Sequence, residues 1–291
     1  MNLEFTKMTG LGNDFVFIED TANEWQLTPE AVEWLCDRNF GVGADGVILV
    51  RTSEDEGAQY YMHYFNADGS LAEMCGNGAR CFVKYLVDHQ LLAPDVNATV
   101  IGTLGGLRPV TFIRDYAGKL STATVDMGEP ILAGADLPST FTGQQVIDQP
   151  LETTEGTFAV TCVAMPNPHA IIWIDDVDDA PVNTVGPIIE RHEAFPNGTN
   201  VEFAHVSKDG TIHLRVWERG VGETLACGTG ACATLVAAAL GDRSGRQATI
   251  ELPGGQLEIA WDDNDHVLMT GSAAEVFSGT IVLPEDEAAS C

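Results

Sequence analysis

Cys75-Gly76-Asn77-Gly78-Ala79 and Cys227-Gly228-Thr229-Gly230-Ala231 are two copies of one pattern, and they lie 152 residues apart in a chain of 291. Nine residues before each cysteine, an aromatic residue is followed by a polar one. These pairs are Phe65-Asn66 in the first half and Trp217-Glu218 in the second. A pattern that returns at about half the chain length is typical of an internal repeat.

A third feature repeats further upstream. Asn13 and Asn167 lie 62 and 60 residues before their cysteines, and each precedes an apolar run that ends in two acidic residues. Agreement at three places in the same order predicts a duplicated domain. A chain of 291 residues is long enough for two domains of ordinary size.

Short runs of β-branched and aromatic residues predict strands in both halves. They cover residues 15–18, 47–50, 60–65, 159–163, 171–174, 211–217, 249–252 and 267–270. Helices are expected at 29–40, with Thr28 as N-cap, and at 79–86 and 231–240, just after the cysteine motifs. The 231–240 segment is apolar nearly all round, which is typical of a buried helix.

Each cysteine lies where a strand-rich segment gives way to a helix. The glycines allow a ligand to approach the backbone, and N–H groups at a helix N-terminus attract an anion. We therefore expect a substrate carboxylate to be held by the N–H groups of Gly76, Asn77, Gly228 and Thr229. We also expect a thiol in this setting to ionise more readily than a free thiol.

Two related halves can place the two helix starts on opposite sides of a cleft, with one thiol on each side of a small molecule. Inversion of an α-carbon needs this arrangement, because one thiolate removes the α-proton while the other thiol protonates the opposite face. The N–H dipoles stabilise the carbanionic intermediate through its carboxylate. The remaining internal cysteines lack such a setting and are interpreted as core: Cys36, Cys81, Cys162 and Cys232.

The charge balance excludes several kinds of partner. The chain has 43 acidic and 14 basic residues, a formal net charge of −29, so its surface repels nucleic acid and anionic lipid. A hydrophobic content of 45 % argues against disorder. The acidity favours adaptation to high salt, where counter-ions screen the self-repulsion, over an ordinary acidic protein.

Cysteine usage and the start of the chain indicate a cytoplasmic protein without a metal site. The seven cysteines are odd in number and contain no Cys-x-x-Cys pair, so neither a disulfide framework nor a zinc site is expected. Residues 1–10 carry no apolar signal segment, and no window approaches the roughly 20 apolar residues of a membrane span. No complete nucleotide-binding loop is present.

The sequence resembles the diaminopimelate epimerase family in several segments that follow the family order over most of the chain. They lie at residues 7–15, 65–70, 74–81, 167–169, 195–200 and 217–230, and the two cysteine motifs are together highly specific. The resemblance implies an α+β fold of two pseudo-symmetric domains, each a curved, mostly antiparallel sheet around a central helix. The first domain would cover residues 1–122 with a returning strand at about 272–284, and the second residues 123–271.

The resemblance also implies an isomerase that interconverts L,L- and meso-diaminopimelate in lysine biosynthesis without pyridoxal phosphate, metal or another cofactor. Cys75 and Cys227 would be its acid/base pair, and the four glycine-motif N–H groups would hold the carboxylate of the reacting centre. The distal amino-acid group would be bound by Asn13, Asn66, Asn167, Asn200, Glu218 and Arg219. His169 would support the cysteines. Family members are often dimers, so a homodimer is the assembly to test.

Two positions depart from the family pattern. Gly46 stands where some members carry glutamine, so that contact is expected to be absent. Pro166 stands where glycine is usual before Asn-Pro-His, which bears on the local turn.

Three alternatives stay open at this point. A proline racemase-like enzyme shares the two-cysteine chemistry, but its substrate has no second amino-acid group for Glu218 and Arg219 to bind. An isomerase of the phenazine-biosynthesis type lacks the cysteine pair. A non-catalytic amino-acid-binding protein would keep the cleft and bind without exchanging the α-proton.

Overall fold

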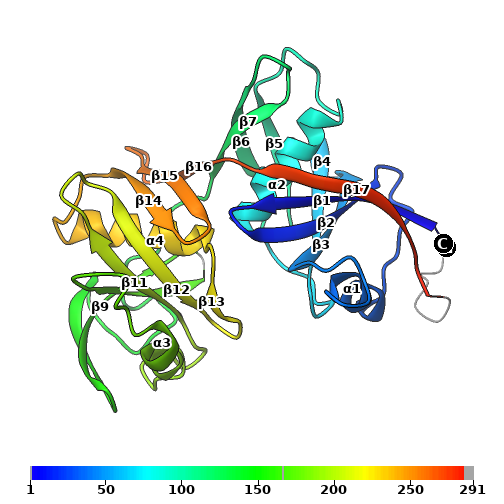
Figure 1. Ribbon diagram of the computed structural model, residues 1–291. Helices are drawn as coiled ribbons and strands as arrows, with labels where there is room; N and C mark the ends of the chain where they lie inside the picture. Colours follow the sequence, from blue (N-terminus) through cyan, green and yellow to red (C-terminus); the bar gives the residue numbers. More distant parts are fainter. Residues whose placement is uncertain (1, 166, 285–291) are drawn as a thin grey trace. The chain divides into compact units, whose positions relative to one another are not determined.

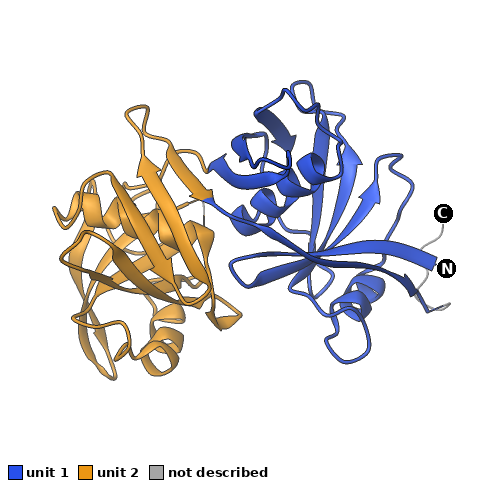
Figure 2. Cartoon of the chain, turned by 45° about the horizontal axis from the view of Figure 1, so that its top comes forward, with its two compact units in different colours: residues 1–125, 271–291 blue, residues 126–270 orange. Residues whose placement is uncertain are grey.

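The computed structural model describes residues 2–165 and 167–284. Pro166, whose effect on the local turn was in question, lies outside the described residues. The chain divides into two compact units, Met1–Val125 with Gly271–Cys291, and Asp126–Thr270 (Figure 2). We call them unit 1 and unit 2.

Unit 1 is built on a mixed sheet. Its strands are β1 (Asn2–Gly10), β2 (Asn13–Asp20), β3 (Gly46–Thr52), β4 (Tyr60–Asn66), β5 (Ala98–Gly102), β6 (Arg108–Arg114), β7 (Leu120–Asp126) and β17 (Ala274–Val282). They lie in the order β17-β1-β2-β3-β4-β5-β6-β7, and β17 runs beside β1 (Figure 1). The β2–β3 and β4–β5 pairs are parallel and the others are antiparallel. Helix α1 (Pro29–Cys36) joins β2 to β3, and α2 (Gly76–Asp88) joins β4 to β5.

The central strands of unit 1 are buried on both faces, which explains their continuous apolar runs. Alternate residues of β2 point to opposite sides of the sheet. Val16 belongs to the core cluster that includes Val32 of α1. Phe17 points the other way, and its ring stacks on Tyr85 of α2 with centroids 5.6 Å apart. The two helices therefore cover opposite faces.

Unit 2 repeats this plan. Its strands are β8 (Val146–Thr153), β9 (Gly156–Ala164), β10 (Pro168–Trp173), β11 (Asn200–Val206), β12 (Ile212–Glu218), β13 (Gly222–Thr224), β14 (Gln247–Leu252), β15 (Gly255–Trp261) and β16 (Val267–Gly271). Apart from the short β13, which pairs with β12, the order is β8-β9-β10-β11-β12-β14-β15-β16. The parallel pairs are β10–β11 and β12–β14. Helix α3 (Val182–Glu190) joins β10 to β11, and α4 (Gly228–Leu240) lies between β13 and β14.

The two sheets thus agree strand by strand in order and direction, with helices at the same two connections. The predicted α+β fold of two similar, mostly antiparallel units is confirmed. Each of the eight predicted strand segments overlaps an observed strand. The returning strand expected at about 272–284 is β17. None of the helices within the described ranges combines the length and the apolarity that crossing a membrane requires.

The first predicted helix is shorter than expected. Thr28 is its N-cap, as predicted, and its side chain accepts the Ala31 N–H at 3.2 Å. The helix nevertheless ends at Cys36 rather than at residue 40. Asp37 ends it, because its side-chain oxygen accepts the backbone N–H groups of Asn39 and Phe40 at 2.7 and 2.9 Å and turns the chain.

Candidate active site

The two motif cysteines are the N-caps of matching helices. Cys75 precedes α2 and accepts the Gly78 N–H on its Sγ at 3.5 Å. Cys227 precedes α4 and accepts the Gly230 N–H at 3.4 Å. Both have extended backbone, and each thiol takes the place that Ser, Thr or Asp usually fills at an N-cap. The helices begin three residues earlier than predicted, because the glycines form their first turns.

The first turns present backbone donors next to the thiols. An α-helix leaves its first N–H groups without an acceptor inside the helix, and its N-terminus carries a partial positive charge. In α2 these groups belong to Gly76 and Asn77, and in α4 to Gly228 and Thr229. The arrangement is chemically suited to an anion, so carboxylate binding by these four residues stays a prediction.

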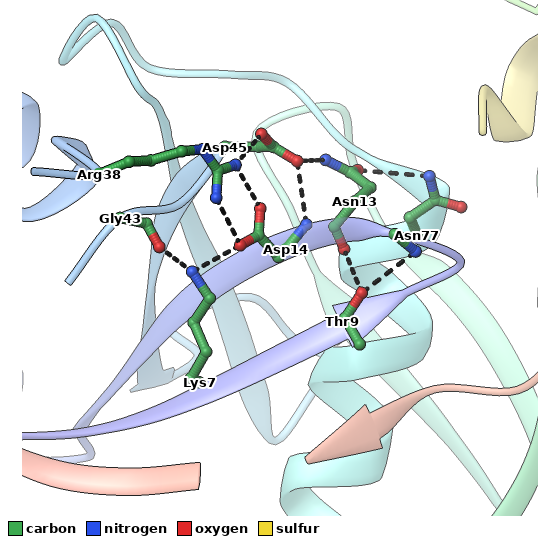
Figure 3. A network of polar contacts seen from close by, with 9 residues as sticks. Lys7, Thr9, Asn13, Asp14, Arg38, Gly43, Asp45 and Asn77 are labelled. Atoms are coloured by element: carbon green, nitrogen blue, oxygen red, sulfur yellow. Dashed lines mark hydrogen bonds and ion pairs between the residues drawn. The ribbon is translucent and has the colours of Figure 1, made fainter. Parts of the chain in front are cut away.

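In unit 1, Asn13 is held with its carbonyl oxygen toward Cys75. Its Nδ2 donates to Asp45 Oδ2 at 2.7 Å (Figure 3). Since a carboxylate only accepts, the amide oxygen must point the other way. That oxygen accepts the Cys75 thiol at 3.5 Å and the Asn77 Nδ2 at 3.3 Å. Asp45 therefore determines which end of the Asn13 amide meets the thiol.

A set of fixed charges supports Asp45. Arg38 donates to Asp45 at 2.8 Å and to both oxygens of Asp14 at 3.1 and 2.8 Å (Figure 3). Buried Lys7 lies 2.6 Å from Asp14 and also donates to the Gly43 carbonyl. Burial by itself raises the pKa of the Asp14 carboxyl, but the hydrogen bonds from Arg38 and Lys7 outweigh it and lower the pKa to about 2.

The Asn66 side chain bonds to a different partner from the residues around Asp45. Its Nδ2 donates to Ser70 Oγ at 3.0 Å, and in the β3–β4 register it lies opposite Gly46. A Cβ added at Gly46 would lie 2.4 Å from the Phe65 carbonyl oxygen and 2.6 Å from the Tyr64 ring. Gly46 therefore leaves no room for a side chain, which gives the departure noted above a steric reason.

In unit 2, His169 and Glu202 form a buried pair. His169 Nδ1 lies 2.6 Å from Glu202 Oε1, and both side chains are fully buried. The other ring nitrogen lies 3.2 Å from the Asn167 Oδ1. His169 is on β10 directly opposite Asn200 of β11, so the parallel register brings Asn167, His169 and Asn200 together.

Asn200 organises the turn after β12. Its Oδ1 accepts the Arg219 backbone N–H at 2.8 Å, while the exposed Arg219 side chain donates to the Asn197 carbonyl at 3.0 Å. Glu218, one residue earlier, accepts the Thr224 hydroxyl at 2.5 Å. Burial raises the pKa of Glu218, and its hydrogen bonds with Thr224 and Cys227 counter this rise. Glu218 and Cys227 are therefore in contact.

The expectation of a readily ionised thiol is wrong for Cys227. Burial raises its pKa well above the ordinary value, and the carboxylates of Glu218 and Glu202 raise it further. The hydrogen bonds from Thr229 and the Gly230 N–H lower it, but by less. The helix N-terminus favours a thiolate only where the thiol is also accessible to water. Cys227 is 4 % exposed.

Three contributors were not assigned from the sequence: Asp45, Glu202 and Thr224. Glu202 carried a usable signal, because it is an acidic residue inside the apolar run of β11. Glu202 occupies the position in β11 that Ile48 occupies in β3. The strand registers show this, because Gly46 pairs with Phe15 in unit 1 as Asn200 pairs with His169 in unit 2. Asp45 and Thr224 carried no such signal, because short polar residues are common in loops.

The described residues include groups that can act as acids and bases. Each unit has one motif thiol at one helix start. Within residues 2–165 and 167–284, no group of three or more His, Cys, Asp or Glu side chains is arranged to hold a metal ion. Among the predicted site residues, hydrogen bonds join Asn13 with Cys75 and Asn77, Asn167 with His169, Asn200 with Arg219, and Cys227 with Thr229.

Sequence comparisons point to one family. The diaminopimelate epimerase family model matches residues 5–133 and 161–276. A protein of Leptospira biflexa named diaminopimelate epimerase is 46 % identical over 282 residues, which are 97 % of this chain and 99 % of that protein. A Nostoc protein named diaminopimelate epimerase 1 is 48 % identical over 285 residues, with coverage of 97 % and 100 %.

Solved structures share the fold at low identity. A hydroxyproline epimerase from Agrobacterium vitis has a TM-score of 0.73 and 13 % identity, covering 98 % of this chain and 94 % of its own. A phenazine biosynthesis protein from Bacillus anthracis has a TM-score of 0.69 and 17 % identity, with coverage of 97 % and 99 %. At these identities the likeness concerns the fold alone, so it does not distinguish among the activities.

Proposed function

Because the chain belongs to the diaminopimelate epimerase family, we propose that it interconverts L,L- and meso-diaminopimelate for lysine biosynthesis, with Cys75 and Cys227 as the acid/base pair. The observation that carries the cysteine assignment is that both thiols cap matching helices in two units of the same topology. The substrate rests on identities of 46 % and 48 % over nearly the whole chain.

The proposed reaction exchanges one proton on each face of the α-carbon. In one direction the Cys75 thiolate takes the α-proton while the Cys227 thiol protonates the opposite face, leaving a Cys75 thiol and a Cys227 thiolate. The reverse reaction starts from that state. The carbanionic intermediate delocalises into the carboxylate, which the N–H groups of Gly76, Asn77, Gly228 and Thr229 hold. Both thiols must then reach one carbon atom when substrate is bound.

The distal amino-acid group provides specificity in this proposal. It is bound by Asn13, Asn66, Asn167, Asn200, Glu218 and Arg219. Arg219 uses one of its five N–H donors on the Asn197 carbonyl, and its planar guanidinium suits a second carboxylate. Glu218 accepts the ammonium group in this proposal. His169 supports the Cys227 side of the site.

The wider proposal follows from the same chemistry and from the charge. Thiols and N–H dipoles supply proton transfer and anion stabilisation, so neither pyridoxal phosphate nor a metal takes part. The net charge of −29 supports an enzyme adapted to high salt, without nucleic-acid or anionic-lipid partners. A cytoplasmic location is part of the proposal. A homodimer is the assembly that we would test first.

Isotope exchange tests the proposed function. The protein is incubated with L,L-diaminopimelate in heavy water, and both stereoisomers are analysed by mass spectrometry at low conversion. Early meso product should carry deuterium at the inverted centre, because its new hydrogen comes from the solvent-equilibrated acid thiol. Recovered substrate should carry much less.

Three outcomes would contradict the proposal. Unlabelled product would mean that one base carries the original proton across. Binding without any α-proton exchange would indicate a non-catalytic binding protein. Proline serves as the control substrate, and its racemisation in place of diaminopimelate turnover would favour a proline racemase-like enzyme.

A further inference from the structure

The residues beneath the two helix starts differ in kind. In unit 1 a Cβ added at Gly78 would meet the side chains of Ile48 at 3.3 Å and Phe15 at 3.6 Å. In unit 2 a Cβ added at Gly230 would lie 2.8 Å from Glu202 Oε1. The carboxylate of Glu202 therefore touches the first turn of α4, whose Gly230 N–H donates to the Cys227 thiol. The matching place in unit 1 is apolar.

The buried pair is not explained by stability. Glu202 Oε2 is buried and has no hydrogen-bond partner among the described residues. An unsatisfied buried polar atom costs roughly 1–3 kcal/mol, and more when it is charged. Unit 1 has Ile48 at the matching position, so the same topology accommodates an apolar residue there. A costly carboxylate beside a site thiol points to a role in the chemistry of that thiol.

We propose that Glu202 is a positioning residue for Cys227: it holds the His169 ring by its Nδ1 and, from beneath the first turn of α4, keeps the resting proton on the Cys227 thiol. The inference rests on the proposed function. It makes Cys227 the acid of the resting enzyme.

The groups around Cys227 support this assignment from each neighbouring strand. Cys162 of β9 has its pKa raised to about 12 by burial, so it adds no charge near neutral pH. Glu218 of β12 and Glu202 of β11 both oppose a thiolate at Cys227. His169 of β10 is the hydrogen-bond partner of Glu202, with 2.6 Å between His169 Nδ1 and Glu202 Oε1. On β14 and β15 the buried residues are Ala248, Ile250, Leu252, Leu257 and Ile259.

The position of the Glu202 carboxyl group determines the sign of the effect. It lies under Gly230, while the His169 ring lies between it and Asn167. A nearby negative charge disfavours a thiolate, so removing it should lower the pH at which Cys227 ionises. With an effective dielectric constant near 20, we expect a change of about one pH unit.

Glu202→Gln tests the proposal, because glutamine keeps the volume and a hydrogen bond to His169 but loses the charge. The pH dependence of iodoacetamide alkylation is measured without substrate, and the Cys75 and Cys227 peptides are resolved by mass spectrometry. The Cys227 midpoint should fall by about one pH unit, while the Cys75 midpoint stays. Asp20→Asn is the matched control, since Asp20 is a buried carboxylate of unit 1, paired with Arg51. It should leave the Cys227 midpoint in place.

An unchanged Cys227 midpoint in Glu202→Gln would overturn the inference, since a purely structural role survives in glutamine. If that variant does not fold, His169→Gln removes the ring and retains the carboxylate. The Cys227 midpoint should then not fall, and a fall would overturn the inference. Wild-type epimerisation is scored separately. An active enzyme with an unmoved midpoint rejects only this inference, whereas an inactive enzyme with a shifted midpoint rejects only the proposed function.

Discussion

Units 1 and 2 use the same sheet order and the same two helical connections, but they surround their cysteines differently. Beside Cys75, polarity comes from Asn13 and a partly exposed set of fixed charges around Asp14 and Asp45. Beside Cys227, it comes from the fully buried pair of His169 and Glu202. A scaffold can therefore repeat while the electrostatics of its two sites diverge.

The divergence continues at other matching positions. Arg80, fully buried in α2, donates to the Asn77 side chain at 2.9 Å, whereas the matching place in α4 is Cys232. Gly46 stands where unit 2 has Asn200. Matching positions of the two units therefore carry different residues within the same topology.

The largest effect should come from removing either thiol. Cys75→Ala and Cys227→Ala should each lower turnover of diaminopimelate by roughly 10²–10⁴-fold or more, because each removes the proton carrier of one face. Conversion of L,L to meso stereoisomer is the measurement. Cys81→Ala and Cys232→Ala are matched controls, since both cysteines are buried in the same two helices. They should cost stability and retain the chemistry. Near-normal turnover in either motif variant would contradict the paired roles.

A second test concerns the fixed charges of unit 1 that involve Lys7, Asp14 and Arg38. The pKa of Asp14 is about 2, below its ordinary value of 3.8. Its carboxylate therefore stabilises the fold above about pH 4, and the contribution is lost as pH falls toward 2. Asp14→Asn should lower the free energy of unfolding by about 2 kcal/mol at pH 7, and the difference should shrink between pH 4 and pH 2.

Urea unfolding of wild type and Asp14→Asn at several pH values measures this difference. Asp95→Asn, at an exposed position, is the control and should change the free energy by less than about 0.5 kcal/mol. A pH-independent difference between wild type and Asp14→Asn would show that the ionised carboxylate is not what stabilises unit 1.

Salt should affect the two units alike. Unit 1 has 21 acidic and 8 basic residues, and unit 2 has 22 and 6, so both carry a large negative net charge, −13 and −16. Screening shortens from about 10 Å at 0.1 M salt to about 3 Å at 1 M, so self-repulsion falls in both. The melting temperature should rise by several degrees from dilute buffer to molar potassium chloride. A melting temperature that does not change with salt would contradict the high-salt proposal and leave the epimerase proposal intact. Stabilisation of one unit alone would contradict the expectation that salt affects both units alike.

The local structure around the cysteines was predictable where local sequence determines it. The two cysteine motifs predicted a helix after each cysteine, although both helices begin three residues earlier than expected. The apolar 231–240 segment predicted the buried α4. Helix α3 was missed because Gly186 and Pro187 interrupt its pattern. The pKa of Cys227 could not be predicted from its motif, because the motif shows the helix N-terminus and not the burial. Glu202 lies on β11, outside the repeated pattern, and only the fold brings it to Cys227.

The pairing of β1 with β17 gives the two units different histories during synthesis. Unit 2 is an uninterrupted stretch of chain and can close its sheet as soon as residue 270 has left the ribosome. Unit 1 cannot, because β1 precedes unit 2 in the chain and β17 follows it. Until β17 has been made, β1 therefore keeps an open edge, which is the kind of surface that other chains can pair with. A nascent chain released before β17 would carry that open edge permanently.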